Sequence, residues 1–150
     1  MDFRISAEPI EPVELKTALA TDTAGACVCF EGWVRDHSGG AAVTALEYES
    51  HEPVAVTEGQ KILAEAVERF NLTAARCVHR VGLLRLGDCA VWVGVSSAHR
   101  AEAFEGCRFI IDSIKERVPI WKKEYYRDGH SGWVNCAVPA QRRAVREAGS

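Results

Sequence analysis

Two lysines seven residues apart are the side chains of this sequence best placed to do chemistry. On a helix, Lys115 lies four residues after Ile111 and beside Ile114, so it projects from the edge of an apolar stripe. Lys122 follows in a segment of strand character, where alternation places it on the face opposite Trp121. An amine whose pKa is lowered by burial or by nearby cations can act as an acid, a base or a nucleophile. The structural alternatives are a lysine stem that covers the core edge at position 115 and a solvated strand residue at position 122.

A second group of polar residues has the chemistry of an anion-binding site. His99 and Arg100 follow Ser96-Ser97-Ala98, at the junction between an apolar strand and the start of a helix. Backbone N–H groups at such a junction favour an anion, and a neighbouring histidine and arginine add directional donors for phosphate. The alternative is a serine N-cap followed by solvent-exposed polar residues. A third candidate, Arg35, ends a strand just before a loop that contains Gly39-Gly40, and such loops often carry function.

The other histidines and the cysteines do not have the spacing of metal or redox sites. Four histidines lack any His-x-x-x-His pattern, so we interpret them as surface or internally satisfied residues. They are His37, His51, His79 and His130. The six cysteines include no Cys-x-x-Cys pair, and four of them fall in apolar runs, which predicts buried structural thiols. These are Cys27, Cys29, Cys77 and Cys89. We therefore predict neither a metal nor a cofactor.

Hydrophobic periodicity predicts the elements that position these candidates. The first half of the chain has a short strand near residues 3–5, a helix of about nine residues opened by Glu11-Pro12, and an amphipathic helix over residues 56–70. Between the two helices, strands at residues 25–35 and 43–49 flank a polar stretch that contains glycine. This pattern predicts a hairpin.

The second half of the chain predicts two strands, one long helix and a final hairpin. The strands lie at residues 75–81 and 89–96, and the hairpin joins residues 120–126 to residues 133–135. Between them, residues 100–117 carry apolar side chains spaced by three and four, and Pro119 ends the helix because it disfavours the α region for the preceding residue. The stripe consists of Phe104, Cys107, Ile111, Ile114 and Val118.

Length and composition limit the fold and the partners. With 150 residues, of which 47% are apolar, we predict a single α+β domain over residues 1–136 and a polar tail at 137–150. The domain should contain a mostly antiparallel sheet and two main helices. A net charge of −3 with dispersed charges argues against nucleic-acid binding. The N-terminus lacks a signal-peptide pattern and no apolar run is long enough to cross a bilayer, so we expect a cytoplasmic protein with no membrane role.

Four segments, taken together, resemble the large, catalytic subunit of molybdopterin synthase. They are Phe30-Glu31-Gly32-Trp33-Val34-Arg35, His79-Arg80-Val81-Gly82, Val93-Gly94-Val95-Ser96-Ser97-Ala98-His99-Arg100 and Pro119-Ile120-Trp121-Lys122. The resemblance implies an α/β hammerhead fold and a sulfurtransferase. Its implied substrate is cyclic pyranopterin monophosphate, which receives two sulfurs to become the molybdopterin dithiolene. The implied sulfur donor is the thiocarboxylated Gly-Gly C-terminus of a small ubiquitin-like subunit.

The same resemblance implies roles for the candidate residues. The catalytic residues would be Lys115 and Lys122. The substrate-binding residues would be Arg35, His99, Arg100, Phe30 and Ile111. One departure from the family pattern lies near the C-terminus, where Asn135-Cys136-Ala137 stand in place of an expected arginine. Neither Arg142 nor Arg143 aligns with that position.

The predicted long helix sets a distance that bears on assembly. At 1.5 Å per residue, His99 and Lys115 at its two ends are separated by about 24 Å. One small substrate cannot touch both, yet the resemblance assigns both to one pocket. Two subunits about a two-fold axis would resolve this conflict, so we predict a homodimer with shared sites within a heterotetramer.

Two other function classes compete with this interpretation. The first is a non-catalytic module of the same fold that binds a ubiquitin-like tail or a phosphate. The second is a small hydrolase, which is disfavoured because no serine or cysteine lies in a recognisable nucleophile elbow.

Overall fold

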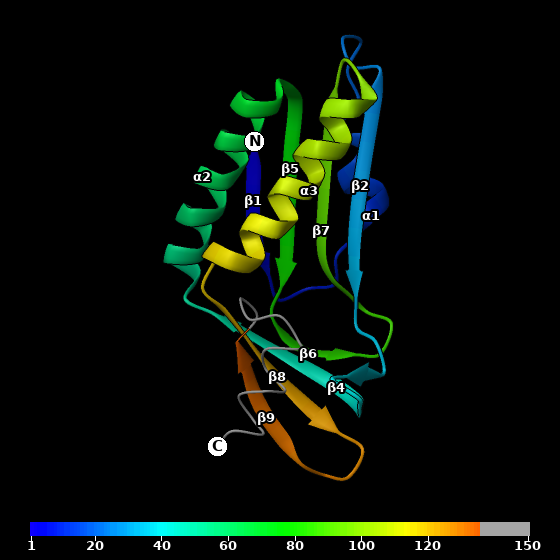
Figure 1. Cartoon of the computed structure of the whole chain (residues 1–150), viewed down its shortest axis with the longest axis vertical. Helices are drawn as coiled ribbons and strands as arrows, with labels where there is room; N and C mark the ends of the chain where they lie inside the picture. The colour runs from blue at the N-terminus through cyan, green and yellow to red at the C-terminus, as the bar shows by residue number, and fades with distance from the viewer. Residues whose placement is uncertain (136–150) are drawn as a thin grey trace.

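Two sheets meet end to end in the computed structural model, which describes residues 1–135 (Figure 1). The first sheet contains, in spatial order, β1 (Asp2–Ser6), β5 (Leu72–Arg80), β7 (Cys89–Ser97) and β2 (Ala26–Trp33). Its β1–β5 pair is parallel and its other pairs are antiparallel. The second sheet contains β3 (His37–Ser38), β4 (Ala41–Ser50), β8 (Ile120–Tyr126) and β9 (Ser131–Asn135), all antiparallel, with β6 (Gly82–Arg85) also paired to β4.

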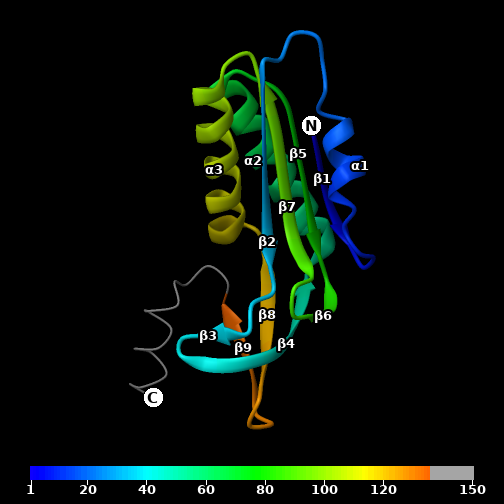
Figure 2. The same ribbon diagram turned by 90° about the vertical axis from the view of Figure 1, so that its right-hand side faces the viewer.

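Helices lie on both faces of the first sheet (Figure 2). The two long helices, α2 (Glu52–Phe70) and α3 (Arg100–Arg117), pack on one face, and α1 (Pro12–Thr17) lies on the other. The main core forms between the sheet and the long helices and includes Phe3, and a smaller cluster under α1 includes Trp92. Among the described residues, no helix is long and apolar enough to span a membrane.

The ends of the two long helices follow from local sequence. Asn71 closes α2 in the left-handed conformation with φ 52°, which asparagine tolerates better than most residues. Val118 closes α3 in an extended conformation with ψ 129°, as expected for the residue before Pro119. The chain therefore leaves α3 almost directly into β8.

The predicted α+β class, the mostly antiparallel pairing and the two main helices are confirmed. Two differences lie at the ends of elements, since α1 has six residues and α2 begins at Glu52. The short strands β3 and β6 were not predicted. The predicted tail at 137–150, with Arg142 and Arg143, lies outside the described residues, as does Cys136.

The predicted hairpin between residues 25–35 and 43–49 is wrong. Within the described part of the chain, β2 pairs with β7 alone, whereas β4 pairs with β3, β6 and β8. Two backbone hydrogen bonds join the end of β2 to the turn before β7, from Val34 N–H to the Asp88 carbonyl (3.0 Å) and from Gly87 N–H to the Val34 carbonyl (2.7 Å). The chain then enters the other sheet. Alternation predicts that a segment is a strand but not its pairing partner.

Some residues predicted in the interior are exposed. Phe104 is 62% exposed, because its side of α3 faces away from the sheet. Cys27 and Cys29 are exposed on β2, which is an edge strand, so the prediction of buried thiols is wrong for this pair. Cys77, on a central strand, is buried as predicted, and Cys89 is partly buried.

We predict that Gly59→Ala destabilises the fold although alanine is the better helix residue. Gly59 in α2 lies against Phe3, and a Cβ at this position would lie 2.3 Å from carbons of the Phe3 ring. The ring is 2% exposed and has no room to move aside. The free energy of unfolding should fall by roughly 1–2 kcal/mol, since overpacking outweighs the gain in helix propensity.

Urea denaturation measures this change. The matched control is Glu68→Ala, an exposed site on the same helix, which should change stability by less than about 0.5 kcal/mol. Equal stability of the wild-type chain and the Gly59→Ala variant would contradict the predicted contact.

Candidate active site

A cavity of about 540 Å³ lies where α3 ends and the two sheets meet. Its walls come from the last turns of α3, from β4 and β8, from the ends of β2 and β5, from the start of β7, and from the segment around β3. The polar and charged residues that line it are Arg35, His37, Ser38, Tyr48, His79, Asp112, Lys115, Glu116, Lys122 and Glu124. The volume is within the range of small-molecule sites.

Lys115 reaches the cavity from the last turn of α3. Its neighbour Ile114 is buried in the core while Lys115 itself is exposed, so the lysine lies at the edge of the apolar stripe where helical spacing predicts it. It makes no hydrogen bond or ion pair with any other residue in the range 1–135. Its amine is therefore available to a ligand.

Lys122 lies on the inner face of β8. Alternation turns Lys122 toward the cavity and Trp121 outward, and 17% of the Lys122 side chain is exposed against 47% of Trp121. The Lys122 Nζ lies 3.7 Å from Oε1 of Glu124. The solvated strand lysine considered as an alternative is thus contradicted, because this side chain is largely buried beside a carboxylate.

Glu124 is a buried cavity residue that the sequence analysis missed. It is 1% exposed, and its Oε1 accepts a hydrogen bond from Ser38 Oγ at 3.1 Å. Its Oε2 has no hydrogen-bond partner within residues 1–135. A buried carboxylate needs a nearby cation, so the glutamate and Lys122 hold each other in place. The available signal was the Lys-x-Glu spacing on a strand, which puts both side chains on one face.

His79 is a second cavity residue whose importance the sequence did not indicate. It is 7% exposed, its Nδ1 lies 2.8 Å from the Arg80 carbonyl oxygen, and its ring meets the ring of Tyr48 edge-on at 5.0 Å. Burial lowers the pKa of His79 to about 4, and the positive charge of Lys115 adds to this shift while the Arg80 hydrogen bond opposes it. The imidazole is therefore neutral near pH 7.

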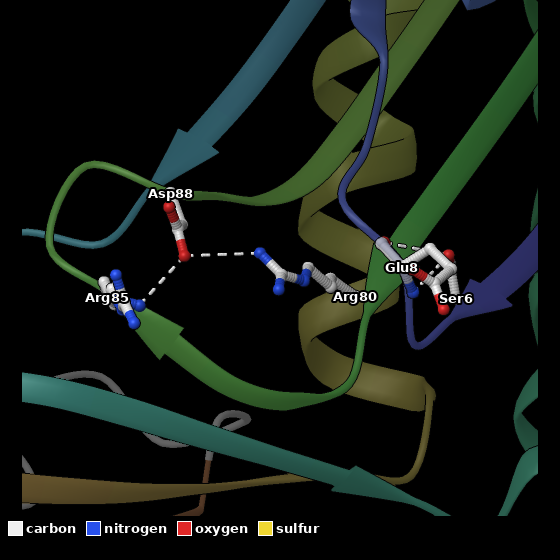
Figure 3. A network of polar contacts seen from close by, with 5 residues as sticks. All are labelled: Ser6, Glu8, Arg80, Arg85 and Asp88. Atoms are coloured by element: carbon white, nitrogen blue, oxygen red, sulfur yellow. Dashed lines mark hydrogen bonds and ion pairs between the residues drawn. The ribbon is translucent and has the colours of Figure 1, made fainter.

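A polar network fixes the backbone beside His79 (Figure 3). Arg80 Nη1 lies 3.3 Å from Oδ2 of Asp88, and the same oxygen accepts a hydrogen bond from the Arg85 backbone N–H at 2.9 Å. Asp88 thereby ties the end of β5 to the end of β6 and to the turn before β7. The carbonyl that accepts the His79 hydrogen bond belongs to this anchored arginine.

The remaining predicted site residues divide into two sets. Arg35 and Ile111 line the cavity with the two lysines. Phe30, 37% exposed on β2, is not among the lining residues, and His99 and Arg100 are exposed at the opposite end of α3. One copy of the chain therefore does not assemble the whole predicted site. Within residues 1–135, no cluster of His, Cys, Asp or Glu is placed to hold a metal ion.

Comparison with known proteins identifies close relatives. The family described as MoaE protein matches residues 5–117. The molybdopterin synthase catalytic subunit of Thermoplasma volcanium is 44% identical over 129 residues, which cover 86% of this chain and 94% of the relative. The protein of the same name from Staphylococcus aureus is 40% identical over 145 residues, which cover 97% of each chain.

Solved structures agree with these sequence relatives. The X-ray structure of molybdopterin synthase from Staphylococcus aureus matches with a TM-score of 0.82 and 38% identity, covering 87% of this chain and 94% of that one. The structure of the MoaE protein of Burkholderia ambifaria matches with a TM-score of 0.78 and 32% identity, covering 98% of each chain. A complex of subunits 1 and 2 of the molybdopterin-converting factor from Helicobacter pylori shares the fold, with a TM-score of 0.70 at 21% identity, covering 84% of this chain and 86% of that one.

The neutral, buried state of His79 predicts a pH dependence of stability. Between the ordinary pKa of 6.5 and the folded value of about 4, the unfolded chain binds a proton that the folded chain does not. The contribution of His79 to stability is therefore intact above pH 6.5 and is lost as the pH falls toward 4. At pH 4.5 the loss should be about 2 kcal/mol.

Urea unfolding at pH 7.5 and pH 4.5 tests this by comparing the wild-type chain with His79→Gln, which should lose less stability on acidification. His51→Gln, at an exposed histidine, should retain the wild-type dependence. Identical pH dependence of the wild-type chain and His79→Gln would show that His79 titrates normally.

Proposed function

The chain belongs to the MoaE protein family, the family of molybdopterin synthase catalytic subunits, and on that basis we propose that it transfers sulfur to cyclic pyranopterin monophosphate. The donor is the thiocarboxylated Gly-Gly C-terminus of a small ubiquitin-like subunit, and the product is the molybdopterin dithiolene. The observation that carries the proposal is the convergence of Lys115, Lys122 and Arg35, from three separate segments, on one cavity.

The charges of the cavity suit an anionic substrate and an anionic donor. Arg35, Lys115 and Lys122 supply three cations to a partly enclosed space, where electrostatic attraction is stronger than in bulk water. Three carboxylates also line the cavity: Glu124 lies beside Lys122, Asp112 lies 3.6 Å from Arg108 on α3, and Glu116 follows Lys115 in the last turn of α3. A phosphate or a thiocarboxylate would find Lys115 and Arg35 without an ion-pair partner among the described residues.

The two lysines have different surroundings and are assigned different roles. Lys115 has no ion pair to break, so we assign it the chemistry that needs a mobile amine, either proton transfer or contact with the acyl group of the donor. Lys122 is largely buried beside Glu124, which holds it in place. We assign Lys122 to the stabilisation of negative charge on the substrate and in the transition state.

The proposed assembly is a homodimer with shared active sites, each served by one small subunit. His99 and Arg100 lie at the start of an 18-residue helix whose last turn carries Lys115, so one chain cannot place all three on one small ligand. Two large apolar side chains are also exposed, Trp33 on edge strand β2 (67%) and Phe104 on α3 (62%). A second subunit would cover such surface and supply His99 and Arg100.

Reconstitution tests the proposed function directly. The purified chain, mixed with a thiocarboxylated small subunit and cyclic pyranopterin monophosphate, should form the dithiolene. Lys115→Ala should reduce the rate by at least about a hundredfold, the usual scale for loss of a general acid or base, while far-UV circular dichroism stays unchanged. A folded Lys115→Ala protein with wild-type turnover would contradict the catalytic role of Lys115, whereas a wild-type chain that binds the small subunit but forms no dithiolene would favour the non-catalytic binding module.

Lys122→Ala should lower the rate by about tenfold or more through the loss of charge stabilisation. The chain offers a matched control in Lys123, the next residue of β8, whose Nζ lies over the rings of Tyr125 and Trp133 and not in the cavity. Lys123→Ala changes net charge equally and should leave the rate within about twofold. Steady-state rates for both variants measure the difference, and equal effects would remove Lys122 from the site.

Mixing two inactive variants tests the shared site. Lys115→Ala and Arg100→Ala chains, each inactive alone, should regain activity together because some mixed dimers contain one intact composite site. Re-equilibrated equal mixtures should approach roughly a quarter of the wild-type rate, since random pairing gives half mixed dimers with one intact site of two. Mixed dimers that form, as native mass spectrometry would detect, without restored activity would contradict the shared site.

A further inference from the structure

His79 and Lys115 enter the same cavity from different elements, the end of β5 and the last turn of α3. Burial lowers the pKa of the His79 imidazole, and the positive charge of Lys115 adds to this shift. Neither the charged end of Lys115 nor the second ring nitrogen of His79 has a hydrogen-bond partner among residues 1–135. An unpartnered donor and an unpartnered ring nitrogen therefore share one space.

The proton on the His79 ring is located by its surroundings. A carbonyl oxygen only accepts hydrogen bonds, so Nδ1, 2.8 Å from the Arg80 oxygen, must carry the proton. The ring is buried and neutral, which leaves Nε2 with its lone pair and makes it an acceptor. The edge contact with Tyr48 limits rotation of the ring, and the Arg80–Asp88 pair anchors the carbonyl that orients it.

We propose that His79 is a positioning residue: when the exposed side chain of Lys115 rotates toward it, His79 Nε2 accepts a hydrogen bond from the Lys115 Nζ and holds that amine inside the cavity. The need for such an acceptor follows from the lysine itself, because its side chain is exposed, flexible and among the most costly in entropy to fix. A buried, rigid, neutral acceptor restricts the amine to one region. Unlike a carboxylate, it does not form an ion pair that would strongly stabilise the protonated amine. The inference rests on the proposed function of Lys115 and adds the residue that positions its amine.

The contact is testable without any turnover. In the full chain labelled with 15N-histidine, the His79 ring should show the Nδ1-protonated neutral tautomer by NMR at pH 7, with its signals assigned by their loss in His79→Asn. Lys115→Met, which keeps a similar stem and removes the amine, should shift the Nε2 resonance of His79. The signals of His130, whose Nδ1 pairs with Asp128 outside the cavity, should not move. An Nε2-protonated tautomer, or an Nε2 resonance unchanged by Lys115→Met, would overturn the proposal.

Kinetics then separate positioning from ligand binding. Asparagine can keep the donor to the Arg80 carbonyl but lacks an atom at the Nε2 position, whereas glutamine places its amide near that position. His79→Asn should lower kcat by about tenfold, the equivalent of one hydrogen bond to a charged group, with KM within about twofold. His79→Gln should recover part of this loss. A raised KM with wild-type kcat would instead mean that Nε2 binds the substrate, and would overturn the positioning role.

These tests also separate this proposal from the proposed function. If the wild-type chain transfers no sulfur, the proposed function fails, while the NMR experiment still decides whether Lys115 contacts His79. If the variant His79→Asn does not fold, the loss of signals in His79→Gln assigns the ring, and the comparison of the wild-type chain with Lys115→Met then gives the answer.

Discussion

A single proline imposes the constraint on which the site depends. Pro119 excludes the helical conformation at Val118, so α3 stops within one turn of Lys115 and the chain continues as β8. β8 then pairs with β4, and this register sets Lys122 opposite Tyr48. A helix that ran on would carry Lys122 about 10 Å further along the axis. Because the helix breaks here, Lys115 on α3 and Lys122 on β8 both line one cavity.

The second constraint is the way the two sheets are joined. β6 lies between β5 and β7 in the chain, which belong to the first sheet, but it pairs with β4 of the second sheet. Backbone hydrogen bonds as well as the covalent chain therefore join the two sheets. Asp88 reinforces this junction through Arg80 and the backbone of Arg85. The cavity lies at this junction, and its walls keep their relative positions because the two sheets cannot easily move apart.

The sequence predicted best what depends on neighbouring residues. Helical spacing placed Lys115 at the edge of its stripe, alternation put Lys122 opposite Trp121, and Pro119 marked the end of α3. Pairing between distant strands was mispredicted, because β2 pairs along its whole length with β7, a segment far away in the chain, and no local pattern encodes such a partner.

Burial was the other property that local pattern could not supply. Cys27 and Cys29 lie in an apolar run yet are exposed, although Val28 between them packs against the main core. Glu124 and His79 are polar yet buried, since each is enclosed by segments far away in the chain. The resemblance supplied the roles of the site residues, and the structure supplied the neighbours that give those roles a physical basis.

The buried carboxylate of Glu124 has a consequence for how this protein tolerates change. Its Oε2 lacks a hydrogen bond within residues 1–135, which costs roughly 1–3 kcal/mol, but an apolar residue in its place would deprive the largely buried Lys122 of its neighbouring carboxylate, a loss of about 3–5 kcal/mol for a buried pair. Replacement of Glu124 alone is therefore expected to destabilise the chain, and only a joint exchange of Glu124 and Lys122 for apolar residues avoids both losses. Because that exchange removes a lysine from the cavity, stability and activity place opposite demands on these two positions.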